Sequence, residues 1–405
     1  MKDYKPGSAG VKVTGITTRL HMPGEEIVDF TLEHLRKYLG LGSGILKDDD
    51  ILCVTESIVA RAQNNFVTIN QIVDDFRKKM DWQSGERVGI VFPIFSRNRY
   101  SMMLQAFARA VPEIVLMLNY PRDEQGNQIL SDQQVMKLGK NPYVDSITMQ
   151  EYDSLSPRFV HPITDMNYID FYSSICKAES CNVEIVLNNN PVDILSKTSK
   201  VLVSNVHDRE TTKALIKQAG TEIVLGLDDL CNQSSEIQGY NPQFGLLGSN
   251  VSDQATERLK LFPRDGDEYA ERIRTAVYNQ FGKKIHVIIY ADGAYKDPST
   301  RIWELADPVV CAGCTPEIAD LFPNELKIKA SVDSYKGQGL SVEEIQQKVL
   351  QDISRVKSKS GNPRDSLQSL GTTPRRIVDL LGSLADLASG SGDRCTPMIH
   401  IANYL

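Results

Sequence analysis

Residues 200–225 read KVLVSNVHDRETTKALIKQAGTEIVL and carry the clearest fold signal in the chain. The apolar residues 201–203 predict a short strand, and residues 222–225 predict a second one. Between them, residues 208–219 predict a helix that Gly220 ends. A strand, a helix and a strand in this order form a βαβ unit, whose two strands run parallel. At least part of the chain should therefore contain a parallel sheet.

Outside this unit, helices and strands do not alternate uniformly. A helix predicted at residues 268–280 leads into a strongly apolar strand at residues 285–290. Ser341 and Glu344 have the spacing of a capping box at the start of a helix. The other expected elements are strands at residues 11–14, 51–55 and 398–402 and helices at residues 96–110 and 373–388. Such a mixture predicts an α+β fold.

The composition predicts a soluble globular protein. Of 405 residues, 41% are hydrophobic and 24% are charged, and the net charge is −7. This chain has no large positive field, which argues against a nucleic-acid partner and a membrane partner. The longest apolar stretch, residues 111–118, is far shorter than the ~20 residues of a membrane-spanning helix. The first residues lack the apolar segment of a signal peptide, so we expect a cytoplasmic protein.

Seven cysteines are scattered through the chain, and their odd number indicates reduced thiols and not a disulfide framework. Cys311 and Cys314 form a CxxC sequence. A zinc site would need a second such pair, and Cys176 and Cys181 have the wrong spacing for it. We interpret these residues as ordinary buried or partly buried thiols.

The loop after the strand at residues 285–290 is the first candidate site. It places Asp292, Lys296 and Asp297 just beyond the end of that strand. Carboxylates in this position can hold a hard cation, and Lys296 could meet a phosphate. Aspartate, glycine and proline are also ordinary turn residues, so a solvated turn is the alternative interpretation.

A glycine-rich loop at residues 389–393 is the second candidate. Gly390 and Gly392, on either side of Ser391, would let backbone N–H groups approach a phosphate closely. The alternative is a helix C-cap, for which one glycine would suffice.

The third candidate is a pair of arginines, Arg97 and Arg99, in the first turn of the helix predicted at residues 96–110. The helix dipole disfavours cations there, and a bound anion would remove the conflict. We therefore expect both arginines to bind the anionic acceptor substrate. The alternative is that both side chains reach into solvent.

Five blocks of sequence, taken in order, resemble the coenzyme F420-0:γ-glutamyl ligase family. They are GITTRL at 15–20, DDILCVTESIVARAQ at 49–63, LKLFPRDGD at 259–267, GKKIHVIIYAD at 282–292, and LADL with SGSGDRCTP at 384–397. No single block is specific, but all five in the family's order are hard to obtain by chance.

The resemblance implies an F420-ligase-like core formed by residues 1–84 and 241–405. The blocks lie outside residues 85–240, which we expect to form an inserted α/β subdomain, in a region where short family members have few residues. The implied enzyme is a homodimer that joins L-glutamate to the carboxylate of a small-molecule acceptor. GTP is the implied co-substrate, and Mg²⁺ or Mn²⁺ is the implied cofactor.

The resemblance also assigns roles to single residues. Those matching nucleotide-binding positions are Ile16, Thr17, Thr18, Arg19, Leu20, Glu56, Ser57, Arg61, Gly390, Ser391 and Gly392. Asp292 matches a metal-binding aspartate and, with Lys296, is the candidate for catalysis. A second metal-binding aspartate is expected where strict register gives Asn250, which brings no charge. Asp253 or Asp297 could supply the missing carboxylate.

The resemblance does not name the acceptor, for which coenzyme F420 and a folate-type carboxylate are both candidates. Two other classes stay open. One is a metal-dependent nucleotide phosphohydrolase that uses Asp292 and Asp297. The other is a nucleotide-binding module without turnover.

Overall fold

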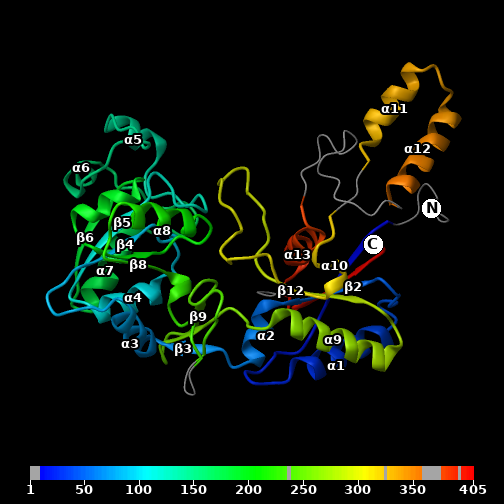
Figure 1. Ribbon diagram of the computed structural model, residues 1–405, viewed down its shortest axis with the longest axis horizontal. Helices are drawn as coiled ribbons and strands as arrows, with labels where there is room; N and C mark the ends of the chain where they lie inside the picture. Colours follow the sequence, from blue (N-terminus) through cyan, green and yellow to red (C-terminus); the bar gives the residue numbers. More distant parts are fainter. Residues whose placement is uncertain (1–9, 235–238, 323–325, 358–374, 391–393) are drawn as a thin grey trace.

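The computed structural model describes residues 10–234, 239–322, 326–357, 375–390 and 394–405. In these ranges the chain forms two lobes, each built on a five-stranded sheet (Figure 1). A third, three-stranded sheet lies near the junction of the lobes. Helices combined with mixed and parallel sheets confirm the predicted α+β class.

The mixed-sheet lobe, on the right in Figure 1, has the strand order β1-β13-β2-β11-β12. Its strands are β1 (Lys12–Ile16), β2 (Ile51–Thr55), β11 (His286–Tyr290), β12 (Cys311–Cys314) and β13 (Met398–Ala402). β2 and β11 run parallel, and the other neighbouring strands are antiparallel. Both halves of the sequence therefore contribute to one sheet.

The central strands β2 and β11 are apolar throughout because both of their faces are covered. The helices of this lobe are α1 (Ile27–Gly40), α2 (Glu56–Ala62), α9 (Gly266–Phe281), α10 (Pro316–Ala319) and α13 (Ile377–Ala388). Leu52 and Val287 pack on the face that α1 and α9 cover. Ile51 and Ile288 pack on the opposite face with α10 and α13. Helices thus cover both faces of the sheet.

The parallel-sheet lobe, on the left in Figure 1, has the strand order β6-β5-β4-β7-β8. Its strands are β4 (Val88–Val91), β5 (Glu113–Leu118), β6 (Asn182–Leu187), β7 (Lys200–Val203) and β8 (Ile223–Gly226). Every neighbouring pair is parallel. The βαβ unit predicted at residues 200–225 is confirmed as β7, α8 and β8.

Helices cover both faces of this parallel sheet. They are α3 (Ile69–Lys79), α4 (Ser101–Ala110), α7 (Tyr168–Ala178) and α8 (Arg209–Gln218), with the short helices α5 (Asp132–Lys137), α6 (Met149–Asp153), η1 (Pro191–Ser196) and η2 (Leu227–Asp229). Phe76 of α3 packs against Phe107 of α4 in the same hydrophobic core. The packed lobe therefore begins before residue 85, where the sequence predicts that the inserted subdomain starts.

The remaining elements are a small sheet and a helical arm. The antiparallel sheet contains β3 (Phe66–Thr68), β9 (Asn250–Asp253) and β10 (Arg258–Lys260), and the arm contains α11 (Ile328–Gly337) and α12 (Val342–Lys357). The capping box predicted before α12 is confirmed by reciprocal hydrogen bonds between Ser341 and Glu344. The predicted helix start at Thr373 and Pro374 lies outside the described residues.

One prediction of secondary structure was wrong. The helix predicted from Ser96 begins at Ser101, because the Ser96 hydroxyl accepts the Arg99 N–H (3.0 Å) and closes a separate turn. Residues 120–200 also contain α7 and β6, which were not among the expected elements. In the part of the chain that the structure describes, no helix has the length and apolar character needed to span a membrane.

Candidate functional site

Four strand ends meet at one edge of the mixed sheet. Ile16 is paired with Met398, and Met398 with Val54, while Thr55 is paired with Tyr290. β1, β2 and β11 therefore end, and β13 begins, at the same edge. The predicted nucleotide residues and Asp292 lie in the segments next to these four strand ends, whereas Asn250 and Asp253 lie in β9 of the small sheet. The fold thus brings together blocks that are far apart in the chain.

Asp292 lies at this edge in an ion-pair cluster with Arg99 and Asp307. The Arg99 guanidinium donates to the Asp292 carboxylate (2.8 Å) and to the Asp307 carboxylate (2.7 Å). The Asp292 backbone N–H also donates to Asp307 (3.1 Å). The Asp307 side chain is 2% exposed and the Asp292 side chain 27% exposed, so Asp292 is the carboxylate that a ligand can reach.

The surroundings of this cluster are acidic. Asp386 of α13 accepts the Gly293 N–H (2.8 Å), and Glu56 lies close enough to influence Asp292. Burial raises the pKa of Asp292 to about 7; Asp307 acts in the same direction, and Arg99 opposes it. Water solvates the Asp292 charge poorly, so its contact with Arg99 matters for keeping that charge.

Glu56 has a cation of its own. Its carboxylate accepts two hydrogen bonds from the Lys260 ammonium (2.7 and 2.8 Å), and both side chains are buried. Burial raises the pKa of Glu56, and Lys260 opposes this shift. The structure places Glu56 at the same edge of the sheet, directly after β2, but commits its carboxylate to Lys260.

The other residues predicted to bind metal or phosphate point to local partners. Asp297 accepts the N–H groups of Ser299 and Thr300 in its own turn, and Asp253 does the same with Ala255. Lys296 lies over the Trp303 ring, 5.1 Å from its centre. Asn250 is paired with Lys260 across β9 and β10. Their metal and catalytic roles stay predictions.

A metal ion can be tested against these contacts. Among the described residues, no group of three or more His, Cys, Asp or Glu side chains could hold one. Mg²⁺ is commonly bound by one or two carboxylates together with substrate phosphates. Asp292, as the more exposed acid of its pair, fits an ion that arrives with a nucleotide, whereas a metal centre made by the protein alone does not fit.

The predicted nucleotide loop lies against the glycine-rich segment. The N–H of Thr18 donates to the carbonyl of Cys395 (2.9 Å), and the N–H of Gly390 donates to the Thr396 hydroxyl (2.7 Å). A Cβ at Gly390 would lie 2.4 Å from the Arg394 side chain, so the backbone here needs glycine. Ser391 and Gly392 lie outside the described residues.

The side chains of the nucleotide loop differ in exposure. Ile16 and Thr18 are buried, whereas Thr17, Arg19 and Leu20 are exposed. Arg19 forms an exposed ion pair with Glu25 and a second one with Glu33 (3.2 Å). Exposed pairs of this kind contribute little stability, so Arg19 can exchange partners easily.

The residues of α2 support this loop from one side. The Arg61 guanidinium donates to the carbonyl of His21 (3.3 Å), and the Arg61 backbone carbonyl accepts the N–H of Gly24 (2.8 Å). Ser57 lies in the first turn of α2 and donates its N–H to the Thr55 hydroxyl (3.5 Å). Arg61 therefore holds the backbone of this loop, whereas Ser57 takes part only in the cap that Thr55 forms at the start of α2.

Arg97 and Arg99 have different surroundings. Arg99 is committed to the two aspartates, whereas Arg97 is exposed and forms no ion pair with any described residue. Both lie in the turn before α4 and not in its first helical turn. The dipole argument that singled them out is therefore wrong, although it drew attention to Arg99.

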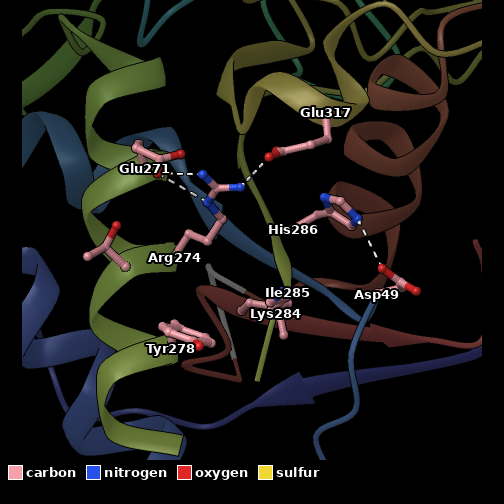
Figure 2. A pocket seen from close by; sticks show the side chains of 9 residues that line it. Asp49, Glu271, Arg274, Tyr278, Lys284, Ile285, His286 and Glu317 are labelled. Atoms are coloured by element: carbon pink, nitrogen blue, oxygen red, sulfur yellow. Dashed lines mark hydrogen bonds and ion pairs between the residues drawn. The ribbon is translucent and has the colours of Figure 1, made fainter. Parts of the chain in front are cut away.

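A cavity of about 450 Å³ lies at the opposite edge of the mixed sheet (Figure 2). On its wall, Arg274 of α9 forms ion pairs with Glu271 (2.6 Å) and Glu317 (2.5 Å). His286, at the start of β11, lies 3.8 Å from Asp49. The predicted nucleotide and metal residues are at the other end of β11, so this cavity is separate from them.

Sequence reasoning missed Asp307 and the partner role of Lys260. Asp307 follows an irregular loop, and no spacing relates it to Asp292 or Arg99. Lys260 stands in the LKLFPRDGD block, but its partner Glu56 lies 204 residues away. Such pairs become visible only when the fold brings them together.

Comparison with known proteins agrees with the geometry. The model of the F420-0:gamma-glutamyl ligase family matches residues 15–403, nearly the full length of the chain. No curated protein matches the chain significantly. The matched range contains all five sequence blocks and the sheet edge at which they meet. The chain therefore belongs to the F420-0:gamma-glutamyl ligase family.

Proposed function

We propose that the protein is a nucleotide-dependent γ-glutamyl ligase that joins the amino group of L-glutamate to the carboxylate of a small acceptor. Family membership supports the coarser part of this proposal, an enzyme that forms C–N bonds. The observation that carries the proposal is the meeting of four strand ends, with their loops, at one edge of the mixed sheet.

The chemistry requires activation, because a carboxylate is a poor acyl donor. An acceptor carboxylate oxygen attacks the γ-phosphorus of GTP, the nucleoside diphosphate leaves, and an acyl phosphate forms. The glutamate amine then attacks the acyl carbon and loses a proton, and phosphate leaves with the former acceptor oxygen. Positioning and charge stabilisation are the main tasks of the protein in such a transfer.

The sheet edge offers groups for both tasks. Arg19 can exchange Glu25 for a phosphate oxygen. A divalent cation bound with the nucleotide would be held by Asp292 and would neutralise phosphate charge. Without that cation, Arg99 holds the Asp292 carboxylate in place through their ion pair (2.8 Å).

The parallel-sheet lobe is our candidate for binding the acceptor. Its residue Arg97 is exposed, is free of ion pairs among the described residues and lies two positions from Arg99 in the same turn. The acceptor is a coenzyme F420-type or folate-type carboxylate.

We also propose that the enzyme is a cytoplasmic homodimer.

The proposal is tested by the substrates that phosphate release requires. The protein is incubated with GTP or ATP, Mg²⁺ or Mn²⁺, L-glutamate and a panel of carboxylate acceptors. A ligase releases phosphate only when both acceptor and glutamate are present. Release that needs neither would identify a phosphohydrolase, and nucleotide binding without release under any mixture would identify a non-catalytic module.

Arg97→Ala should raise the KM for the acceptor by roughly tenfold, because an exposed charge-assisted contact is worth about 1–2 kcal/mol. The KM for GTP should stay unchanged. Steady-state kinetics with each substrate varied in turn measures both values. An unchanged KM for the acceptor would show that Arg97 simply lies in solvent.

A photoreactive GTP analogue should label peptides of the mixed-sheet lobe and not residues 85–240. The reason is that the predicted nucleotide residues adjoin the ends of β1, β2 and β13. Peptide mapping of the labelled protein, with and without excess GTP as competitor, shows which parts of the chain carry the label. Labelling that falls mainly within residues 85–240 and disappears with GTP would contradict this placement.

A further inference from the structure

Arg99 reaches from one lobe to the other. It lies in the turn before α4 of the parallel-sheet lobe, whereas Asp292 and Asp307 belong to the loop between β11 and β12 of the mixed-sheet lobe. One guanidinium nitrogen contacts each carboxylate, at 2.8 and 2.7 Å. The two acids are therefore bridged by a cation that their own lobe does not supply.

The two aspartates need this cation. They are adjacent, since the Asp292 N–H donates to the Asp307 carboxylate (3.1 Å), and the Asp307 side chain is 2% exposed. Like charges this close and this poorly solvated repel one another strongly. An arginine suits the position because it is always charged and its planar fork can contact two carboxylates at once.

Other nearby cations have different partners. The Lys260 ammonium donates to both carboxylate oxygens of Glu56. The nearby acid Asp386 accepts the N–H of Gly293 and has no such cation in that contact. Among the described residues, Arg99 is the side-chain cation that forms ion pairs with Asp292 and Asp307. The positive charge that contacts both carboxylates thus comes from one residue of the other lobe.

We infer that Arg99 is the built-in countercation of the Asp292–Asp307 pair and keeps a free divalent cation from binding there. An ion approaching the pair meets a guanidinium already seated between the carboxylates. Only an ion that brings further ligands, such as nucleotide phosphates, gains enough binding free energy to compete with the Arg99 guanidinium for the carboxylates. Arg99 is therefore a positioning residue through which the parallel-sheet lobe controls cation entry into the ligase site.

This consequence for catalysis rests on the proposed function, but the inference itself concerns the protein without substrates. Its test is a Mn²⁺ titration in the absence of nucleotide, in which electron paramagnetic resonance measures free Mn²⁺. The proteins compared are wild type, Arg99→Gln, Arg99→Lys and the double variant Arg99→Gln/Asp307→Asn. Arg97→Gln is the matched control, because it removes an exposed arginine from the same turn.

Wild type and Arg97→Gln should bind Mn²⁺ only weakly. Arg99→Gln should bind one Mn²⁺ at least about tenfold more tightly, since a positive charge in contact with both ligands is gone. The added Asp307→Asn change should abolish the gain, and Arg99→Lys, which keeps the charge, should remain close to wild type. Thermal unfolding of each variant checks that the lobes stay folded.

Two results would overturn the inference. One is tight Mn²⁺ binding by wild type without nucleotide. That result alone would mean that Arg99 does not exclude a free divalent cation. The other is a folded Arg99→Gln protein with the affinity of wild type. Neither result depends on ligase turnover, so a failure of the proposed function would not be confused with a failure of this inference.

Discussion

Asp292→Asn should lower ligase turnover by roughly 100- to 1000-fold. The change keeps the shape of the side chain but removes its charge, so Arg99 loses one of its two ionic partners and a nucleotide-bound cation loses its carboxylate. Losing one preorganised group that stabilises the transition state typically costs ~3–4 kcal/mol. The concentration of Mg²⁺ or Mn²⁺ at half-maximal rate should also rise.

The measurement is steady-state turnover at saturating substrates across a range of metal concentrations. Asp74→Asn, the same change on an exposed position of α3, is the matched control and should behave like wild type. Both variants should unfold near the wild-type temperature. Near-normal turnover of Asp292→Asn with an unshifted metal dependence would place the catalytic carboxylate elsewhere.

Lys260→Met should destabilise the fold by about 3–5 kcal/mol, because it leaves the buried Glu56 carboxylate without its cation. The pair joins the start of α2 to β10, so the loss affects the packing between the mixed-sheet lobe and the small sheet. Equilibrium unfolding in urea gives the change in free energy. A loss below about 1 kcal/mol would mean that water replaces Lys260 easily.

Two comparisons separate the buried charge from lost packing. Removing both charges in Glu56→Gln/Lys260→Met should restore part of the stability, because no unpaired ion stays buried. The single variant should also be less destabilised at about pH 5 than at about pH 8. Burial raises the pKa of Glu56 in the folded state, so lower pH favours its neutral form and with it the fold. Equal losses at both pH values would point to packing alone.

The parts of the fold that the sequence predicts are those with local signals. β2 and β11 are continuous apolar runs because they are buried on both faces, and such runs stand out in any sequence. The βαβ unit is visible because Gly220 marks the end of its helix. β6 was missed because Asn182 and Glu184 interrupt its apolar pattern.

The site was predicted only in part, for a physical reason. Asp292 adjoins an obvious strand, so its position is visible locally. Arg99 pairs with Asp292 across 193 residues and with Asp307 across 208 residues, and no periodicity encodes such contacts. Ser96 resembled a helix N-cap because it does bond the N–H three residues later, yet the chain forms a turn there.

The central claim is that the protein joins glutamate to a carboxylate through an acyl phosphate. The most direct test uses an acceptor whose carboxylate carries heavy oxygen, with GTP, a divalent metal and L-glutamate, and mass spectrometry of product and phosphate. We predict that the acceptor gains one glutamyl residue and that one heavy oxygen atom appears in the released phosphate. Phosphate released without heavy oxygen, with the acceptor unchanged, would contradict the account.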